Sequence, residues 1–206
     1  RYAFGGSVGQ LILSKLPIRD VEVVEFPSYG SRRANIHAKI GGLNYVFVHF
    51  PYDIVADAGL SGLTLPGVLQ PVLAQAAIDS GADLIVGDLN SGPNYQSDAY
   101  NLVAASYAEL SAGAGPTYCT QEMINAQDHR CCVPFPGVPG EVLCRLPLSF
   151  DHVFLNNKWR SYFDGNSLFA SSSEDAQVPL SDHAGLEAHA FLTRCDLSEE
   201  ELKGLK

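Results

Sequence analysis

Long uninterrupted apolar runs are absent from this sequence of 206 residues. Hydrophobic residues make up 46% of the chain, but Gly, Pro, Gln or Asp interrupts even the longest apolar stretches within a few residues. Because a membrane-spanning helix needs about 20 consecutive apolar residues, no transmembrane segment is expected. No basic stretch followed by an apolar one is visible as a targeting segment. The composition predicts a single domain over residues 1–206 with a real core and an acidic tail at 196–206.

Positive charge is also scarce. The chain has 13 Lys and Arg against 23 Asp and Glu, which gives a formal net charge of −10. A broad acidic surface repels the phosphate backbone and disfavours tight, nonspecific binding of nucleic acid. It does not exclude a nuclease that uses bound cations locally. The charge therefore favours a neutral or zwitterionic substrate over a polyanionic one.

No Cys-x-x-Cys pair occurs, so a zinc site is the weaker interpretation of the cysteines, even with His129 nearby. The five cysteines are Cys119, Cys131, Cys132, Cys144 and Cys195. Four of them fall in the Gly- and Pro-rich stretch 111–147, which is too long for a simple connection. One or two disulfides that staple this loop would indicate a secreted or lumenal protein. Free thiols in a cytoplasmic protein are the alternative.

Several segments have the pattern of regular secondary structure. Alternation and β-branched residues predict strands at 10–13, 21–26, 34–40, 43–50 (after a Gly-Gly turn), 83–86, 149–155, 159–163 and 185–192. Helical spacing predicts a helix over 65–80, which Pro71 would shorten if the helix began there. A second helix is expected over 97–107, capped by Ser97 or Asp98. No internal repeat divides the chain.

Three segments place polar residues at the end of an apolar strand, where buried sheets present catalytic groups. They are LIVGDLN at 84–90, FDHVFLN at 150–156 and LSDHAGLEAHAF at 180–191. Each has an ordinary structural explanation when taken alone. Asp88 and Asn90 can form an Asx turn. Asp151 can cap a strand end, and His49 can be a core histidine. In this order and at these separations, the three segments are far more specific than any one of them.

These segments resemble the endonuclease/exonuclease/phosphatase (DNase I-like) superfamily. GQLILSKLPI at 9–18 and YVFVHF at 45–50 are similar to two further motifs of that superfamily, and Ser181-Asp182-His183 matches its most diagnostic motif. The stretch 117–151 looks most like neutral sphingomyelinases. The resemblance implies an α+β fold, a four-layer αββα sandwich of two mostly antiparallel sheets.

The resemblance also implies that the domain is incomplete at its N-terminus. The superfamily begins with a strand that bears an Asn and continues with a strand that carries Gln-Glu, whose Glu is the principal metal ligand. Neither motif precedes Gly5. Gln121-Glu122 follows the Gly-Asp-Leu-Asn turn, which is the wrong order, so the role is not transferred to Glu122.

The resemblance implies a site of six residues, which are His49, Asp88, Asn90, Asp151, Asp182 and His183. His183 would be the general base, and Asp151 would orient its imidazole. Asp88 would position or deprotonate the attacking water. Asn90 would donate hydrogen bonds to the phosphoryl group.

The remaining two residues complete this expected site. Asp182 would hold the metal directly or through its surroundings. His49 would stabilise the transition state or protonate the leaving group. A carboxylate-rich site suits Mg²⁺, which prefers oxygen ligands. The other histidines, His37, His129, His152 and His189, have no motif support and are expected to be structural or exposed.

Two classes of function follow from these features. The first is a Mg²⁺-dependent phosphodiester hydrolase, most closely of the sphingomyelinase type, that acts on a phosphodiester or phospholipid substrate. A nuclease or an inositol-phosphate phosphatase of the same superfamily is an alternative within this class. The second is a catalytically inactive relative that serves as a binding subunit, with a protein partner covering the incomplete sheet.

Overall fold

The computed structural model describes residues 10–26, 33–51, 65–129, 131–134, 140–162, 166–169, 183 and 185–188. Its elements are, in chain order, β1 (Ile18–Phe26), β2 (Arg33–Ile40), β3 (Leu43–His49), α2 (Leu65–Asp79), β4 (Leu84–Asp88), α3 (Ser97–Ser106), β5 (Tyr107–Glu109), α4 (Gln121–Asn125), β6 (Cys132–Pro134), β7 (Val142–Cys144), β8 (Asp151–Asn156), a 3₁₀ helix (Asn157–Tyr162), β9 (Asn166–Phe169) and β10 (Gly185–Ala188). Within the described part of the chain, no helix combines the length and the apolar character needed to cross a membrane.

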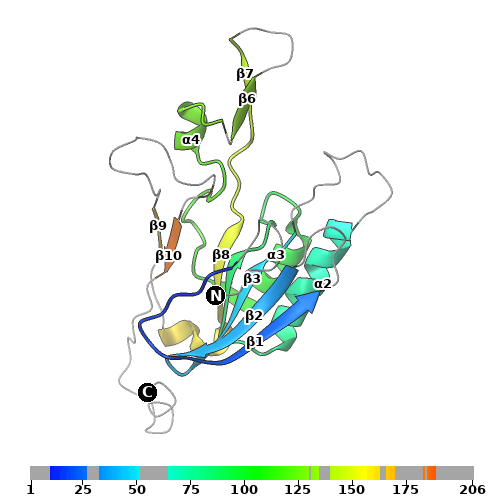
Figure 1. Ribbon diagram of the computed structural model, residues 1–206, viewed down its shortest axis with the longest axis vertical. Helices are drawn as coiled ribbons and strands as arrows, with labels where there is room; N and C mark the ends of the chain where they lie inside the picture. Colours follow the sequence, from blue (N-terminus) through cyan, green and yellow to red (C-terminus); the bar gives the residue numbers. More distant parts are fainter. Residues whose placement is uncertain are drawn as a thin grey trace.

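The central element is a six-stranded sheet with the order β1-β2-β3-β4-β8-β5 (Figure 1). Its neighbouring strands are antiparallel except for β3 and β4, which are parallel and are joined through α2. The tight hairpin between β2 and β3 turns at Gly41 and Gly42, whose φ angles are +59° and +89°. Two-residue hairpin turns of this kind need positive φ, which glycine adopts without strain. The turn predicted here is therefore confirmed.

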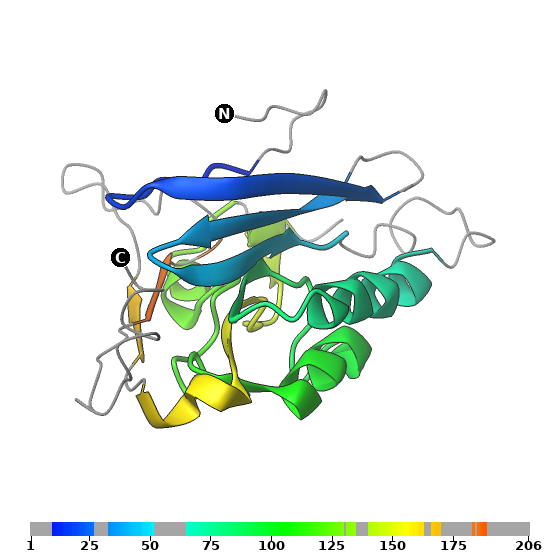
Figure 2. The same cartoon turned by 90° about the horizontal axis from the view of Figure 1, so that it is seen from below.

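One face of the central sheet is covered by α2 and α3 (Figure 2). Side chains alternate between the faces along a strand. The register pairs Val46 of β3 with Ile85 of β4 and Ile85 with Phe154 of β8, so these three side chains share a face. They form a buried core with Leu73, Ala74 and Ala77 of α2 and with Ala99 and Val103 of α3. This core holds the sheet and the two helices together.

The opposite face of the sheet has its own apolar cluster. Leu84 of β4 and Val153 and Leu155 of β8 are buried there, and Leu186 of β10 packs against them. β10 pairs with β9 in a second, two-stranded sheet. The structure is thus a mixed α+β fold with helices on one side of the central sheet and a strand of another sheet on the other. The predicted fold class is confirmed.

The Gly-, Pro- and Cys-rich stretch forms a projection that we call the disulfide arm, residues 119–144 (Figure 1). It contains α4 and the β6–β7 hairpin. Disulfides join Cys119 to Cys131 and Cys132 to Cys144. One or two disulfides were expected in this stretch, and the structure contains two, which confirms the expectation. Cys195 lies outside the described residues.

Two segments that were expected to be strands are not. At 10–13 only Gln10 forms an isolated bridge, and Leu11 and Leu13 are 68% and 84% exposed, so no packing fixes an extended strand there. The 159–163 segment begins within the 3₁₀ helix Asn157–Tyr162. Its Trp159 donates from Nε1 to Oδ1 of Asp83 at 2.7 Å, a tertiary bond that outweighs the β propensity of an aromatic residue.

The two main helices also differ in detail from expectation. α2 begins at Leu65, so Pro71 lies inside the helix rather than at its start. Packing of Leu73, Ala74 and Ala77 against the sheet offsets the hydrogen bond that proline cannot make. The N-cap of α3 is Gln96 in the left-handed region, without a side-chain cap, rather than Ser97 or Asp98.

Candidate functional site

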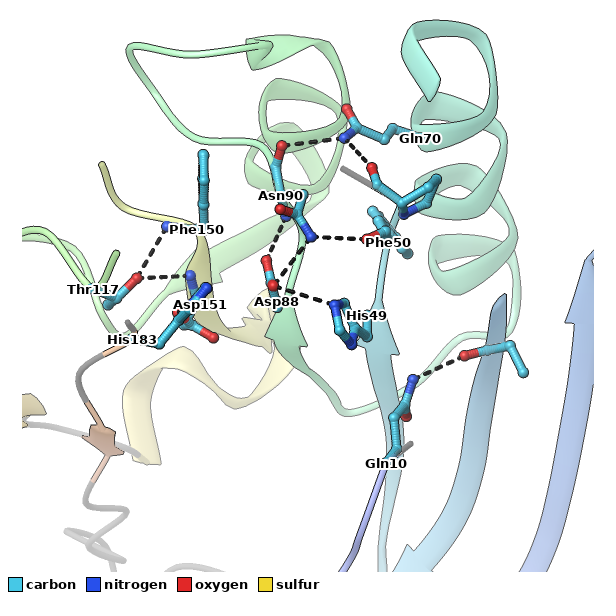
Figure 3. Close-up of polar contacts among 12 residues, drawn as sticks. Gln10, His49, Phe50, Gln70, Asp88, Asn90, Thr117, Phe150, Asp151 and His183 are labelled. Carbon is cyan, nitrogen blue, oxygen red and sulfur yellow. Dashed lines mark hydrogen bonds and ion pairs between the residues drawn. The ribbon is translucent and has the colours of Figure 1, made fainter. Parts of the chain in front are cut away.

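Strand register brings three of the expected residues into one row. His49 at the end of β3 is paired with Asp88 at the end of β4, and Asp88 is paired with Asp151 at the start of β8. All three side chains alternate onto the face opposite α2 and α3. Residues that are far apart in the sequence thus meet at one end of the central sheet (Figure 3).

Two glycines allow the backbone to come together at this end of the sheet. Gly87 has a φ of +134°, and a Cβ at this position would lie 2.1 Å from the carbonyl oxygen of Val48. A Cβ at Gly92 would lie 2.1 Å from the carbonyl oxygen of Ser149. No side chain fits at either distance. The strand before Asp88 and the loop after it therefore approach β3 and the start of β8 only because these residues are glycines.

The carboxylate of Asp88 is fixed by the loop that follows it. The backbone N–H of Asn90 donates to Oδ1 at 2.7 Å, and Nδ2 of Asn90 donates to Oδ2 at 3.1 Å. Nε2 of His49 lies 3.5 Å from Oδ2 (Figure 3). Asn90 has a φ of +45°, in the left-handed region that Asn tolerates better than most residues. The Asx-type turn expected as the structural alternative is therefore present, and it holds Asp88 in one orientation.

Asn90 is only 5% exposed, and its side chain is hydrogen-bonded to the carboxylate of Asp88. Its Nδ2 donates to the carbonyl oxygen of Phe50 at 2.9 Å as well as to Asp88. These two bonds use both hydrogens of the amide. In this arrangement Asn90 orients Asp88 and secures the end of β3, and donation to a phosphoryl group stays a prediction.

Gln70 of α2 is a site residue that the sequence pattern did not indicate. It is 1% exposed, and its Nε2 donates to the carbonyl oxygens of Pro51 at 2.8 Å and Asn90 at 3.1 Å (Figure 3). One buried amide thus joins the segment after β3 to the loop after β4. A glutamine in an otherwise helical pattern gives no local signal of such a role, because its partners are tertiary.

Asp151 and His183 form the second half of the site. Nδ1 of His183 and Oδ2 of Asp151 are 2.6 Å apart, and the side chains are 26% and 24% exposed. This is the contact implied for a carboxylate that orients an imidazole. The catalytic roles of both residues stay predictions. Asp182 lies outside the described residues, so its metal-binding role is likewise a prediction.

Thr117 and Tyr118 hold this pair in place. Oγ1 of Thr117 accepts hydrogen bonds from the backbone N–H groups of Phe150 and Asp151 at 3.1 and 3.0 Å. Tyr118 forms a β-bridge with His183, and their ring centroids are 5.0 Å apart. Neither role was visible in the sequence, because the contacts span more than 30 residues.

The donor set fits a hard divalent cation. Asp88, Asp151 and His183 each offer one ligand atom, and the three atoms lie within 4.8 Å of one another. Two ionised carboxylates this close repel each other unless a positive charge lies between them. Carboxylate oxygens are the ligands that Mg²⁺ prefers. The chemistry of these residues therefore matches the expected metal, although it does not identify it.

A further polar atom near this end of the sheet lacks a partner. Nε2 of Gln10 donates to the carbonyl oxygen of Ala34 at 3.1 Å, whereas its Oε1 is buried and bonds to nothing within the described residues. Figure 3 shows the amide directed toward the side of the site that carries His49. A buried acceptor of this kind costs stability until a donor or cation reaches it.

A buried polar network surrounds His152, the residue that follows Asp151 on β8. His152 is 1% exposed, with Nδ1 2.7 Å from Oε1 of Glu109 and Nε2 3.0 Å from the carbonyl oxygen of Ser91. Both partners are acceptors, so both bonds form together only when each ring nitrogen carries a hydrogen. Tyr100 donates to Oε2 of Glu109 at 2.7 Å, and Ser111 donates to Oε1 at 2.9 Å. His152 is thus a structural histidine, as expected from its lack of motif support.

Two groups of this network, Tyr100 and Glu109, have shifted pKa values. Burial, followed by the hydrogen bond and charge of Glu109, raises the pKa of Tyr100 to about 12. Burial also acts to raise the pKa of Glu109, but hydrogen bonds from His152 and Tyr100 outweigh it and lower that pKa. Between this network and the site is a cavity of about 140 Å³, lined by groups that include Glu109, Thr117 and Asp151.

Comparison with solved structures places the chain in the DNase I-like fold. The alignment with a 3′–5′ exonuclease, NExo from Neisseria meningitidis, covers 86% of this chain and 73% of the exonuclease, with a TM-score of 0.58 and 16% identity. A 3′ phosphatase NExo from Neisseria, bound to a product DNA hairpin, aligns over 86% of this chain and 72% of its own, with a TM-score of 0.57 and 13% identity.

A third structure, truncated TDP2 from Caenorhabditis elegans, aligns over 84% of this chain and 66% of its own, with a TM-score of 0.51 and 15% identity. This chain therefore spans slightly less than two thirds of that structure. No protein-family model and no curated protein matches the sequence. At these identities the structural likeness establishes the fold and leaves the reaction to be argued from the site.

Proposed function

We propose that this chain is a metal-dependent phosphodiester hydrolase with Asp88, Asp151 and His183 at its reaction centre. The observation that carries the proposal is the meeting of these three ligand-bearing side chains within 4.8 Å, at the end of the central sheet. The DNase I-like fold adds support, because the structures that share it include an exonuclease and a phosphatase. These are enzymes that act on phosphate esters.

His183 would act as the general base. Its Nδ1 is engaged by the Asp151 carboxylate, which favours the tautomer with hydrogen on Nδ1. Nε2 is then the atom that takes a proton from the attacking water as the water oxygen bonds to phosphorus. The negative charge of Asp151 stabilises the imidazolium that results. The ester bond to the leaving oxygen breaks in the same displacement.

Asp88 and His49 would assist the same displacement. The carboxylate of Asp88 is oriented by Asn90 and would position the water. His49 lies within 3.5 Å of Asp88 and would donate a proton to the leaving oxygen. Asp88 and Asp151, with Asp182 as a further expected ligand, would hold the metal. A bound Mg²⁺ would neutralise charge on the phosphoryl oxygens and the leaving oxygen.

The substrate class is the finer part of the proposal. Nucleic acid is the first candidate, since the comparison includes a structure bound to DNA. A phosphocholine lipid is the second candidate. It is favoured by three exposed apolar side chains on or next to the disulfide arm, Val133 (52%), Leu143 (56%) and Leu146 (75%). Two disulfides support the further proposal that the protein is secreted or lumenal, because such bonds persist in oxidising compartments.

The proposal is tested with a small diester that either substrate class resembles. Bis(p-nitrophenyl) phosphate is offered to the wild-type protein with Mg²⁺ and with EDTA. The expected result is turnover that EDTA abolishes and that His183→Ala lowers by about 10²–10⁴-fold. His129→Ala is the matched control, because the side chain of His129 is 87% exposed and outside the site.

The same experiment separates the enzyme from the non-catalytic alternative. A folded wild-type chain with no turnover under any divalent cation would support a binding subunit with a DNase I-like fold. Full activity in His183→Ala would show that hydrolysis, if observed, does not use the base proposed here.

A further inference from the structure

Arg145 is an exposed cation that the sequence analysis did not single out, and it lies at the base of the disulfide arm. It directly follows Cys144, and its backbone N–H donates to the carbonyl oxygen of Cys131 at 2.8 Å. Its Nη1 donates to the hydroxyl of Tyr118, and its guanidinium carbon lies 5.7 Å from the centre of the Tyr118 ring. Backbone and side chain together therefore fix the position of the guanidinium.

Tyr118 connects this cation to the reaction centre. The Tyr118 side chain is nearly buried, with the residue 5% exposed, and its ring packs against the rings of Phe150 at 5.1 Å and His183 at 5.0 Å. The guanidinium of Arg145 is thus separated from the imidazole of His183 by a single aromatic ring. One side chain, Tyr118, thus contacts both the imidazole of His183 and the guanidinium of Arg145.

The charge of Arg145 has no counterpart in the described part of the chain. No carboxylate among these residues forms an ion pair with it, and its described partners are the phenol of Tyr118 and a backbone carbonyl. A guanidinium matches phosphate oxygens in shape and charge. In a protein with a net charge of −10, a cation fixed on the side chain that contacts His183 favours an anion at this place.

We propose that Arg145 binds an anionic group of the substrate next to the phosphodiester that is hydrolysed, and that Tyr118 positions it. This inference rests on the proposed hydrolase function and assigns its substrate class, a nucleic-acid strand with consecutive phosphates. A phosphocholine lipid fits less well. Its single phosphate is the reacting group, and its trimethylammonium group would be repelled by the guanidinium.

The inference is tested by binding without turnover. A fluorescein-labelled single-stranded DNA oligonucleotide is titrated with protein in EDTA, at a series of salt concentrations, and anisotropy is measured. Arg145→Gln is expected to weaken binding by about 10-fold at low salt, the size of one charge-assisted contact. It should also reduce the slope of log affinity against log salt by about 0.7, the value for one phosphate contact on a single strand.

Two further variants complete the design. Arg19→Gln removes the same charge from an exposed position on β1, the opposite edge strand from β5, and is expected to bind like the wild type. Arg145→Lys keeps the charge and is expected to retain the salt slope while losing part of the affinity. Circular dichroism and thermal unfolding of all variants verify folding, and Arg145→Lys keeps the test valid if Arg145→Gln does not fold.

Equal affinity and slope in the wild type and Arg145→Gln would overturn the inference, as would a wild-type protein that does not bind the oligonucleotide at low salt. Loss of binding to phosphocholine vesicles in Arg145→Gln, with unchanged oligonucleotide binding, would overturn the assigned substrate class. Because no turnover is needed, these outcomes are separate from a failure to hydrolyse bis(p-nitrophenyl) phosphate with metal, which would count against the hydrolase function itself.

Discussion

Asp88 and Asp151 are register partners across the antiparallel strands β4 and β8, and each contributes a ligand atom to a cluster less than 4.8 Å across. β4 ends at Asp88 and β8 begins at Asp151, so the antiparallel pairing alone puts the two carboxylates at the same end of the sheet. Their mutual repulsion is the cost of this arrangement in the absence of a cation. The site is therefore built to gain from binding positive charge.

Asp88→Asn is expected to weaken metal binding without damaging the fold. The amide keeps the shape of the side chain but removes one of the two facing charges, so stability in EDTA should change by less than about 1 kcal/mol. Saturating Mg²⁺, at about 100 times its dissociation constant, should stabilise the wild type by about 2.7 kcal/mol. The variant should gain much less at the same concentration.

Thermal unfolding with and without Mg²⁺ measures both effects. Asp79→Asn is the matched control, because Asp79 is exposed at the end of α2 and should leave the Mg²⁺ effect unchanged. Equal Mg²⁺ stabilisation of the wild type and Asp88→Asn would remove Asp88 from the metal site.

Asp151→Asn and His183→Ala are expected to be non-additive. The Asp151 carboxylate would act on Nδ1 of His183 as well as on the metal, so the part of its effect that passes through the imidazole is lost when the imidazole is absent. Asp151→Asn alone should lower kcat by about 10²–10⁴-fold, and adding it to His183→Ala should cost less than this. A double-mutant cycle on the hydrolysis of bis(p-nitrophenyl) phosphate measures the coupling. Independent effects of the two substitutions would mean that Asp151 works on the metal or the phosphate rather than on the histidine.

Thr117→Val is expected to destabilise the start of β8. Valine has nearly the shape of threonine but cannot accept the N–H bonds of Phe150 and Asp151, both of which end at Oγ1. An unsatisfied buried donor costs about 1–3 kcal/mol, so a loss of about 2–4 kcal/mol in the free energy of unfolding is expected.

Urea unfolding measures this loss. Thr117→Ser keeps the hydroxyl and is expected to recover most of it. A stable Thr117→Val variant, equal to the wild type, would show that the two N–H groups find other acceptors.

Glu109 is expected to make the fold sensitive to acid. Burial favours its neutral form most strongly, yet the bonds from His152, Tyr100 and Ser111 prevail and lower its pKa from 4.5. A carboxyl with a lowered pKa in the folded state contributes stability that is fully present above its unfolded value and is lost as pH falls through the folded value. The contribution should therefore be complete at neutral pH and disappear as pH falls below about 4.5.

Glu109→Gln isolates this contribution from those of other carboxyls. The difference in the free energy of unfolding between the wild type and Glu109→Gln should be largest near neutral pH and shrink in acid, as measured by urea unfolding at several pH values. Glu141→Gln changes an exposed carboxyl on the disulfide arm and should show no such trend. A difference that is constant with pH would mean that Glu109 is not ionised in the folded protein.

Local patterns in the sequence predicted the parts of this structure that depend on neighbouring residues. Alternation and the Gly41-Gly42 turn predicted β2 and β3, and the apolar run before Asp88 predicted β4. The motif resemblance named Asp88, Asp151 and His183, which the structure brings together, and their catalytic roles stay predictions. The strand patterns come from a few adjacent residues in the sequence.

Long-range contacts account for what was not predicted. Gln70, Thr117 and Tyr118 act through contacts with segments 19 or more residues away, and the residues adjacent to them in the sequence give no sign of these contacts. Trp159 has strong β propensity but lies in a 3₁₀ helix because its indole bonds to Asp83. The pairing of adjacent Cys131 and Cys132 with different partners also depends on the folded arm.

The two disulfides of the arm create a short covalent route between Tyr118 and Arg145. The route runs from Cys119 to Cys131, across one peptide bond to Cys132, and on to Cys144. This route does not pass through residues 120–130 or 133–143 of the chain. The spacing of Tyr118, which contacts His183, and Arg145 therefore has a covalent link that is independent of these segments. The two disulfides thus hold the base of the arm together by covalent bonds, next to the contact between Tyr118 and His183.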